Sequence, residues 1–339
     1  MSELAYANIV ALGMVENHIF DLAHVQNRDD CFQPYYLTRE KMMSHSIQLN
    51  TSELNELQKI AFELHLDVQN TITSIPSYLL MLESTQIYRA NGIESNWDNY
   101  RKVFTWNDDL VDGIRFIKIH LPNLINIHQA DGFTNRNHFC CLIAGNKALS
   151  TKDERNLYPE RVKAIRWFEQ HAPQDFDLYG TGWNMPEATS GLLGRLMQRF
   201  CRLLSQVVCL QPFSSYRGKV SHKRDVLKRT RFAICYENVR DIPGYITEKI
   251  FDCFFSGCIP VYWGANNITD YIPADCFIDR RQFQDTEAVY RHLKAMPEQA
   301  FIQYQQRIAD FLKSDAAYLF SSEHFAETIV NTVVQDLGV

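Results

Sequence analysis

The sequence predicts an α/β fold built on parallel sheets, and three observations support this prediction. Short apolar runs alternate with longer amphipathic stretches, which is the order expected of strands and crossover helices. No internal repeat or low-complexity tract interrupts the alternation. Residues 138–180 and 232–263 each contain a strand, a polar loop, a helix and a second strand in that order. The chain has 339 residues, above the roughly 250 at which single cores tend to divide, so it is long enough for two domains, and one compact body is the alternative.

The first half of the chain has the weaker pattern. Apolar runs predict strands, and one amphipathic stretch predicts a helix. The predicted strands are Ala7–Leu12, Ser46–Asn50, Tyr78–Leu82 and Phe116–His120, and the predicted helix is Ser52–Leu64. We place the first domain at 1–135 and the second at 136–320. A C-terminal helix in 321–339, near Phe325–Val334, is expected to pack back on the first domain.

The second half opens with a β-loop-α-β unit. His138–Gly145 is apolar and short enough for a buried strand, and Asp175–Gly180 predicts the next one. Between them, Pro159–His171 predicts a helix, because proline suits the first turn, where its missing N–H is no loss.

The strongest unit lies between residues 232 and 263. Phe232–Tyr236 and Cys258–Trp263 predict strands, and between them Thr247 can cap a helix that Gly257 ends. Ligands of open parallel sheets bind beyond the carboxyl ends of the strands. The polar loops 237–249 and 264–267 are therefore candidate ligand loops.

Side chains in the first of these loops suit a nucleotide-linked sugar. Lys249 at a helix start can stabilise phosphate charge, and Glu248 can accept hydrogen bonds from sugar hydroxyls. Tyr245 and Asn238 add flat and polar contacts. The alternative interpretation is a helix cap with a solvated charge pair. The net charge of −6 attracts neither nucleic acid nor an anionic membrane, so an anion site must be local.

The segment 232–264 resembles the signature of glycosyltransferase family 10, the α1,3/4-fucosyltransferases. The matching residues are the Glu-Asn pair at 237–238, Tyr-Ile-Thr-Glu-Lys at 245–249 and Pro-Val-Tyr-Trp-Gly at 260–264. The resemblance implies a GT-B fold with two facing Rossmann-like domains. It also implies GDP-fucose as the donor substrate.

The resemblance carries the family's site residues onto this sequence. The donor-binding residues fall on Asn238, Tyr245, Glu248 and Lys249, with Glu237, Trp263 and Gly264 as further candidates. Independently of the resemblance, the basic stretch ahead of the donor strand offers Lys223 or Arg217 as a phosphate contact, and a solvated basic face is the favoured alternative. A family arginine that meets the diphosphate falls on Arg161, and the nearby Arg155 is its rival. Either arginine could instead be a surface charge at a helix end.

The family's general base is a glutamate after a strand of the first domain, and it falls on Glu83. A base needs an ionised carboxylate within hydrogen-bond reach of the acceptor hydroxyl. Glu94 and Asp109 are the reserve candidates. The alternative for Glu83 is a surface carboxylate at a strand end.

The resemblance implies an inverting transfer of L-fucose to an oligosaccharide hydroxyl, O3 of N-acetylglucosamine, in surface glycan or lipopolysaccharide synthesis. Other interpretations are a transferase of another GDP-6-deoxysugar, or a non-catalytic module that binds a GDP-sugar or glycan. No Asp-x-Asp motif stands at a clear strand end, and we expect neither a required cofactor nor an essential divalent metal.

The location is expected to be cytoplasmic, at the inner face of a bacterial membrane. The N-terminus has no secretory pattern and no apolar run reaches about 18 residues. The nine cysteines form no C-x-x-C pair, which favours free thiols in a reducing compartment. A basic helix at Leu192–Leu204 is a candidate for peripheral contact with a membrane that holds a lipid-linked glycan acceptor, although an ordinary packed helix is the favoured interpretation.

Overall fold

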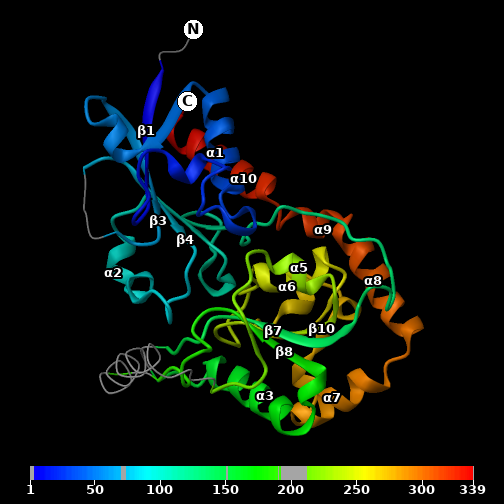
Figure 1. The fold of residues 1–339 in the computed structure, drawn as a ribbon. Helices are drawn as coiled ribbons and strands as arrows, with labels where there is room; N and C mark the ends of the chain where they lie inside the picture. Colours follow the sequence, from blue (N-terminus) through cyan, green and yellow to red (C-terminus); the bar gives the residue numbers. More distant parts are fainter. Residues whose placement is uncertain (1–3, 70–73, 150–151, 190, 192–211, 339) are drawn as a thin grey trace. The chain divides into compact units, whose positions relative to one another are not determined.

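The computed structural model describes residues 4–69, 74–149, 152–189, 191 and 212–338 (Figure 1). The chain forms two compact units. The first contains Met1–Ile125 and Asp315–Val339, and the second contains Asn126–Ser314. The division expected from the sequence lies later in the chain, between residues 135 and 136.

The first unit contains a six-stranded sheet in the order β2-β1-β3-β4-β5-β6, and every neighbouring pair is parallel. Its strands are β1 (Ala5–Val10), β2 (Ile47–Thr51), β3 (Ile60–Leu66), β4 (Ser77–Met81), β5 (Lys102–Thr105) and β6 (Phe116–Lys118). Short helices lie in the connections: η1 (His18–Phe20), η2 (Arg28–Asp30), η3 (Ser52–Asn55), η4 (Arg89–Gly92), α2 (Glu94–Trp97) and η5 (Asp108–Leu110).

The helix predicted over Ser52–Leu64 is wrong. Only Ser52–Asn55 is helical, as the single turn η3, and Ile60–Leu66 is strand β3 between β1 and β4. Phe62 and Leu64 join the apolar core, while Glu63 and His65 between them are buried too, paired with each other at 3.1 Å. With both faces buried, the strand lacks the apolar–polar alternation that would have distinguished it from a helix.

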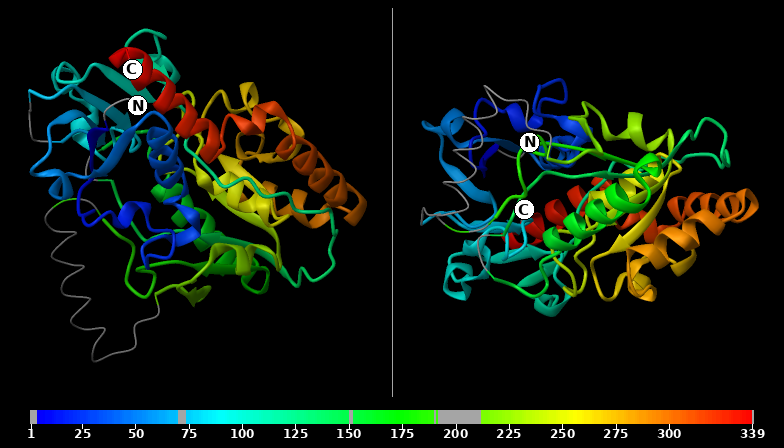
Figure 2. Two further views of the ribbon diagram at one scale, coloured as in Figure 1. Left: turned by 90° about the horizontal axis from the view of Figure 1, so that it is seen from above. Right: turned by 60° about the horizontal axis from the view of Figure 1, so that its bottom comes forward.

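Two helices from opposite ends of the chain pack on this sheet (Figures 1 and 2). They are α1 (Gln33–Ser44) and α10 (Ser322–Leu337), which contact each other through Tyr35 and Phe325 with ring centroids 6.4 Å apart. The Ser321 hydroxyl caps α10 by accepting from the backbone N–H of His324. The C-terminal helix is therefore part of the first unit's core.

The second unit contains another parallel sheet, in the order β12-β11-β10-β7-β8-β9. Its strands are β7 (His138–Ile143), β8 (Phe176–Tyr179), β9 (Tyr216–Gly218), β10 (Thr230–Tyr236), β11 (Ile259–Trp263) and β12 (Ile278–Asp279). Its described α-helices are α3 (Tyr158–His171), α5 (Lys223–Leu227), α6 (Glu248–Phe255), α7 (Thr286–Ala295) and α8 (Glu298–Leu312). The next helix, α9 (Asp315–Tyr318), belongs to the first unit.

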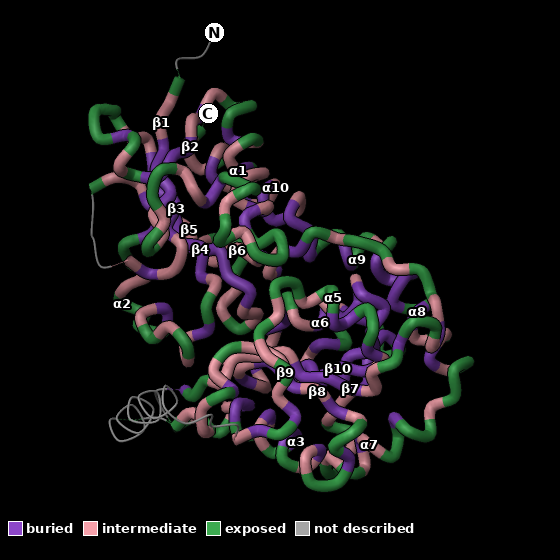
Figure 3. The backbone as a smooth tube through the Cα atoms, viewed as in Figure 1, coloured by how far each residue is buried: buried purple, intermediate pink, exposed green. Residues whose placement is uncertain are grey.

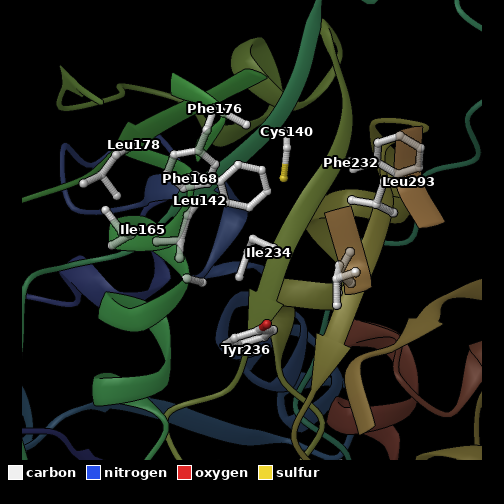
Figure 4. Packing of buried hydrophobic residues seen from close by; sticks show 14 of the residues in the cluster. Cys140, Leu142, Ile165, Phe168, Phe176, Leu178, Phe232, Ile234, Tyr236 and Leu293 are labelled. Atoms are coloured by element: carbon white, nitrogen blue, oxygen red, sulfur yellow. The ribbon is translucent and has the colours of Figure 1, made fainter. Parts of the chain in front are cut away.

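Aromatic and aliphatic side chains join helices to the central strands of this sheet (Figure 4). Phe168 of α3 stacks on Phe176 of β8 with centroids 4.6 Å apart, and Leu293 of α7 belongs to the same core. Buried residues run along the central strands β7, β10 and β11 (Figure 3). This packing fixes the positions of the carboxyl ends of the central strands.

The chain changes direction between β7 and β10. From β7 the chain runs through α3 to β8 and β9 on one side, and then returns to β10 on the other. Ligands of open α/β sheets bind at such a topological switch point, beyond the carboxyl ends of the strands. The fold therefore predicts a site next to Ile143 and Tyr236.

The helix predicted at Leu192–Leu204 lies outside the described residues. Among the helices that the structure describes, none is long and apolar enough to cross a membrane. Every described cysteine is a free thiol, and all are buried except Cys31.

Candidate functional site

A pocket opens at the switch point of the second sheet. It is lined by the ends of β7 and β10, by α5, and by the first turns of α3 and α6. Among its lining residues are the sequence candidates Arg161, Lys223, Asn238, Glu248 and Lys249. Five side chains that the sequence spreads over some 90 positions therefore face one cavity of the second unit.

The N-terminus of α6 is held by a buried carboxylate. Glu237, fully buried at the end of β10, accepts from the backbone N–H of Thr247 at 2.9 Å and from its hydroxyl at 2.8 Å. Its Oε2 lies 3.0 Å from Nζ of Lys249, whose ammonium also donates to the Thr247 hydroxyl at 2.9 Å. One carboxylate thus orients both the helix cap and the lysine.

Neighbouring opposite charges stabilise the ionised forms of Glu248 and Lys249, the first two residues of α6. Burial would lower the pKa of Lys249, but Glu237 and Glu248 raise it above its usual range. Desolvation would raise the pKa of Glu248, but Lys249 and Lys223 lower it to about 2. The Glu248 side chain is half exposed, so its carboxylate is available to a ligand.

Arg161 is a buried cation that has only neutral hydrogen-bond partners. It is 3% exposed, and donates to the carbonyl of Tyr236 at 2.6 and 3.2 Å and to Oδ1 of Asn238 at 3.0 Å. Its guanidinium stacks on the ring of Tyr158 at 4.8 Å. Within the described part of the chain no carboxylate forms an ion pair with it, and burial lowers its pKa. A desolvated charge of this kind favours an anionic ligand.

The rival Arg155 has a different environment. Its side chain is 43% exposed, and it donates to both oxygens of Asp153, at 3.0 and 2.8 Å. It does not line the pocket. Lys223 does line it, while its ammonium contacts Asp252 at 2.7 Å and Glu248 at 3.6 Å.

Three other candidates support the pocket from outside its lining. Tyr245 is buried, and its hydroxyl accepts from Nδ2 of Asn238 at 3.4 Å. Trp263 packs edge-on against Tyr236 with centroids 5.5 Å apart. A Cβ at Gly264 would lie 2.5 Å from Cγ of Glu237, so only glycine allows this approach to the buried carboxylate.

Glu83 lies in the first unit, directly after β4. Its side chain is exposed. Negative charge at Glu83 and at Asp67, which follows β3, adds to burial in raising the pKa of the Tyr35 phenol. The reserve carboxylates Glu94 and Asp109 are also exposed, in α2 and η5.

Sequence reasoning missed several residues around these sites. Tyr158 lies one helical turn before Arg161, and Asp252 one turn after Glu248, so helical spacing could have indicated both. Asp67 and Asn91, which contact the backbone of Glu83, have no such signal. The pairing of β3 with β4 brings Asp67 to the Glu83 turn, and the connection through η4 returns Asn91 to it without helical spacing. The described residues contain no group of three His, Cys, Asp or Glu side chains that could hold a metal ion.

Comparison with known sequences finds relatives of one kind. Residues 146–310 match the family profile described as glycosyltransferase family 10 (fucosyltransferase), C-terminal part. A 75-residue stretch is 32% identical to the Helicobacter pylori alpha-(1,3)-fucosyltransferase FucT, covering 22% of this chain and 16% of that one. An 88-residue stretch is 28% identical to an Arabidopsis thaliana alpha-(1,4)-fucosyltransferase, covering 26% and 22%. The chain thus matches less than a quarter of the length of either relative.

Solved structures share the fold over almost the whole chain. An alpha1,3-fucosyltransferase with GDP superimposes with a TM-score of 0.54 at 12% identity, covering 99% of this chain and 92% of that one. An alpha-glucosyltransferase in complex with UDP-glucose and DNA superimposes with a TM-score of 0.55 at 10% identity, covering 98% and 99%. At such identities the likeness concerns the fold, which is of the GT-B type.

Proposed function

Because residues 146–310 match the profile of glycosyltransferase family 10, in a chain of GT-B fold, we propose that this protein transfers L-fucose from GDP-fucose, with inversion, to a hydroxyl of an oligosaccharide. The observation that carries the proposal is the buried guanidinium of Arg161, which lines the pocket and forms no ion pair with a carboxylate of the residues that the structure describes. We further propose O3 of N-acetylglucosamine as the acceptor position.

The donor diphosphate supplies the anion that Arg161 lacks. A buried cation is costly unless it is paired, and a diphosphate would offset that cost each time it binds. The first turn of α6 adds backbone N–H groups and the ammonium of Lys249, both favourable to phosphate oxygens. Lys223, at the pocket wall, is a further phosphate contact in this proposal.

The proposed roles of the remaining donor residues follow from their positions. Glu248 presents a half-exposed, ionised carboxylate that can accept hydrogen bonds from sugar or ribose hydroxyls. Asn238 faces the pocket and is oriented by Arg161 and Tyr245. In this proposal the identity of the nucleotide and sugar comes from the family resemblance and from the activities for which the relatives are named.

The proposed reaction is a single displacement. Glu83 accepts the proton of the acceptor hydroxyl as the oxygen attacks the anomeric carbon, and the bond from that carbon to the diphosphate oxygen breaks with its electron pair. GDP leaves on the side opposite the attack, so the configuration inverts. Arg161 and Lys249 stabilise the negative charge that grows on the departing diphosphate. Because these two cations face it, we expect activity to survive chelation of divalent metals by EDTA.

The proposed acceptor is an oligosaccharide or lipid-linked glycan of surface glycan or lipopolysaccharide synthesis, made in the cytoplasm at the inner face of the membrane. Nucleic acid is not a proposed partner, because the net charge is −6. The class of acceptor rests on the family resemblance, and the location rests on the sequence pattern.

A transfer assay tests the proposal. Radiolabelled GDP-fucose and an N-acetyllactosamine acceptor are incubated with the unmodified protein, Glu83→Gln, Lys249→Ala and the surface control Lys163→Ala, whose side chain is 70% exposed. We expect product from the unmodified protein and the control, and a large loss in the two site variants. Full activity of Lys249→Ala would overturn the donor-site assignment. Donor binding without transfer or hydrolysis would favour a non-catalytic binding module.

A further inference from the structure

One carboxylate accepts hydrogen bonds from two successive backbone N–H groups in the turn that carries Glu83. Oδ1 of Asp67, at the end of β3, accepts from the backbone N–H groups of Leu82 at 2.8 Å and of Glu83 at 3.0 Å. Asp67 thereby joins the carboxyl ends of two adjacent strands. The backbone nitrogen of the proposed base has a charged acceptor rather than water.

A buried amide completes this arrangement. Nδ2 of Asn91, in η4, donates to the same Oδ1 of Asp67 at 2.7 Å and to the carbonyl oxygen of Glu83 at 2.9 Å. Its Oδ1 accepts from the backbone N–H of Val68 at 3.0 Å. Asn91 is fully buried, and all three contacts are to the two strand ends. Both backbone polar groups of Glu83 are thus fixed, while its side chain is exposed.

Asp67 adopts a backbone conformation that costs free energy. Its φ of 56° lies in the left-handed region, which a residue with a Cβ rarely occupies. Such a conformation persists only where the surrounding structure determines it, and it occurs more often at functional sites. Here the three hydrogen bonds to the Asp67 carboxylate stabilise this conformation. Glycine would take the same φ without strain, which provides a variant that keeps the fold.

We propose that Asp67 and Asn91 are positioning residues for the proposed base, holding the turn so that the Glu83 carboxylate projects in one fixed direction. The inference rests on the proposed function, because it needs Glu83 to take the acceptor proton. A base must lie within hydrogen-bond distance of the proton it removes, and a misplacement of about 1 Å can cost on the order of 100-fold in rate. Neither residue touches substrate in this account; both act through Glu83.

The test compares Asp67→Gly, Asp67→Asn and Glu83→Gln, together with the double variant Asp67→Gly/Glu83→Gln. Asp67→Gly removes the acceptor for both amides, and we expect kcat for transfer to fall about 10-fold to about 100-fold. The affinity for GDP should not change, because the proposed donor residues lie in the other unit. Asp67→Asn keeps an oxygen that can accept both N–H groups, so we expect it to retain most of the activity.

The double variant distinguishes positioning from a structural role. If Asp67 acts through Glu83, then Asp67→Gly costs nothing further once Glu83 is glutamine. An equal loss in both backgrounds, or an unchanged kcat in Asp67→Gly, would overturn the inference while leaving the proposed function intact. Full activity of Glu83→Gln would instead overturn the base assignment and the inference with it. Unchanged GDP affinity checks that the second unit remains folded, and an unchanged far-UV circular dichroism spectrum and urea-unfolding transition check the same for the first unit, which carries the substitutions.

Discussion

Replacing Arg161 with methionine is predicted to separate ligand binding from stability. Methionine keeps the length of an unbranched apolar side chain and removes the charge from a site that is 3% exposed. A hydrogen bond to a charged group contributes about 1.5–3 kcal/mol, so GDP should bind about 10-fold to about 150-fold more weakly.

The same substitution should cost little stability. It removes the donors to the Tyr236 carbonyl and to Asn238, but it also removes a buried charge that has no carboxylate partner in the described part of the chain. These effects oppose each other, and we expect the unfolding free energy of the ligand-free protein to fall by no more than about 1 kcal/mol. If Arg161 had only a structural role, the substitution would lower the unfolding free energy and would leave the affinity for GDP as it is in the unmodified protein.

Isothermal titration with GDP and urea unfolding measure the two quantities. Arg155→Met is the matched control, because Arg155 pairs with Asp153 outside the pocket. We expect that control to bind GDP as the unmodified protein does. Unchanged GDP affinity in Arg161→Met, or a large loss in Arg155→Met, would refute the assignment of the buried cation to the diphosphate.

Three further predictions concern the region around α6. Glu237→Gln leaves Lys249 without its buried partner and should lower the unfolding free energy by about 3 kcal/mol, whereas Glu160→Gln in an exposed pair should cost less than about 1 kcal/mol; equal losses in urea unfolding would contradict this. Gly264→Ala places a Cβ 2.5 Å from Cγ of Glu237, so we expect a loss of about 1–3 kcal/mol in the same measurement and weaker GDP binding. The lowered pKa of Glu248, about 2, means that its charge stabilises the folded chain fully above its usual value of 4.5 and that this contribution is lost as the pH falls towards 2. Glu248→Gln should therefore flatten the pH dependence of stability between about pH 4.5 and 2, and an unchanged acid-unfolding curve would argue against the pairing.

The donor side was predictable because its signals are local. The strand that ends at Tyr236, the cap at Thr247 and the stop at Gly257 lie within one short stretch, and each has a known sequence preference. Parallel-sheet topology then indicates where a ligand binds. Spacing alone does not show which guanidinium is buried; in the structure Arg161 is buried at the pocket and Arg155 is partly exposed, and the assignment of Arg161 to the diphosphate stays a proposal.

The first unit was harder to predict for a physical reason. Strand β3 is buried on both faces, with Glu63 and His65 satisfied by each other and by Asn8 and Tyr100, so polar residues in the sequence did not mark a solvent face. The contacts of Asp67 with the Glu83 turn likewise depend on the pairing of β3 with β4. Such long-range hydrogen bonds have no periodic signature in a single sequence.

A thermal-shift panel with GDP, UDP, ADP and CDP tests the central claim most directly, because a ligand that binds only the folded state raises its stability. The proposed GDP-sugar pocket predicts that GDP raises the melting temperature well above the other three nucleotides, and that Arg161→Met removes most of this rise. Stabilisation by UDP and none by GDP would contradict the account.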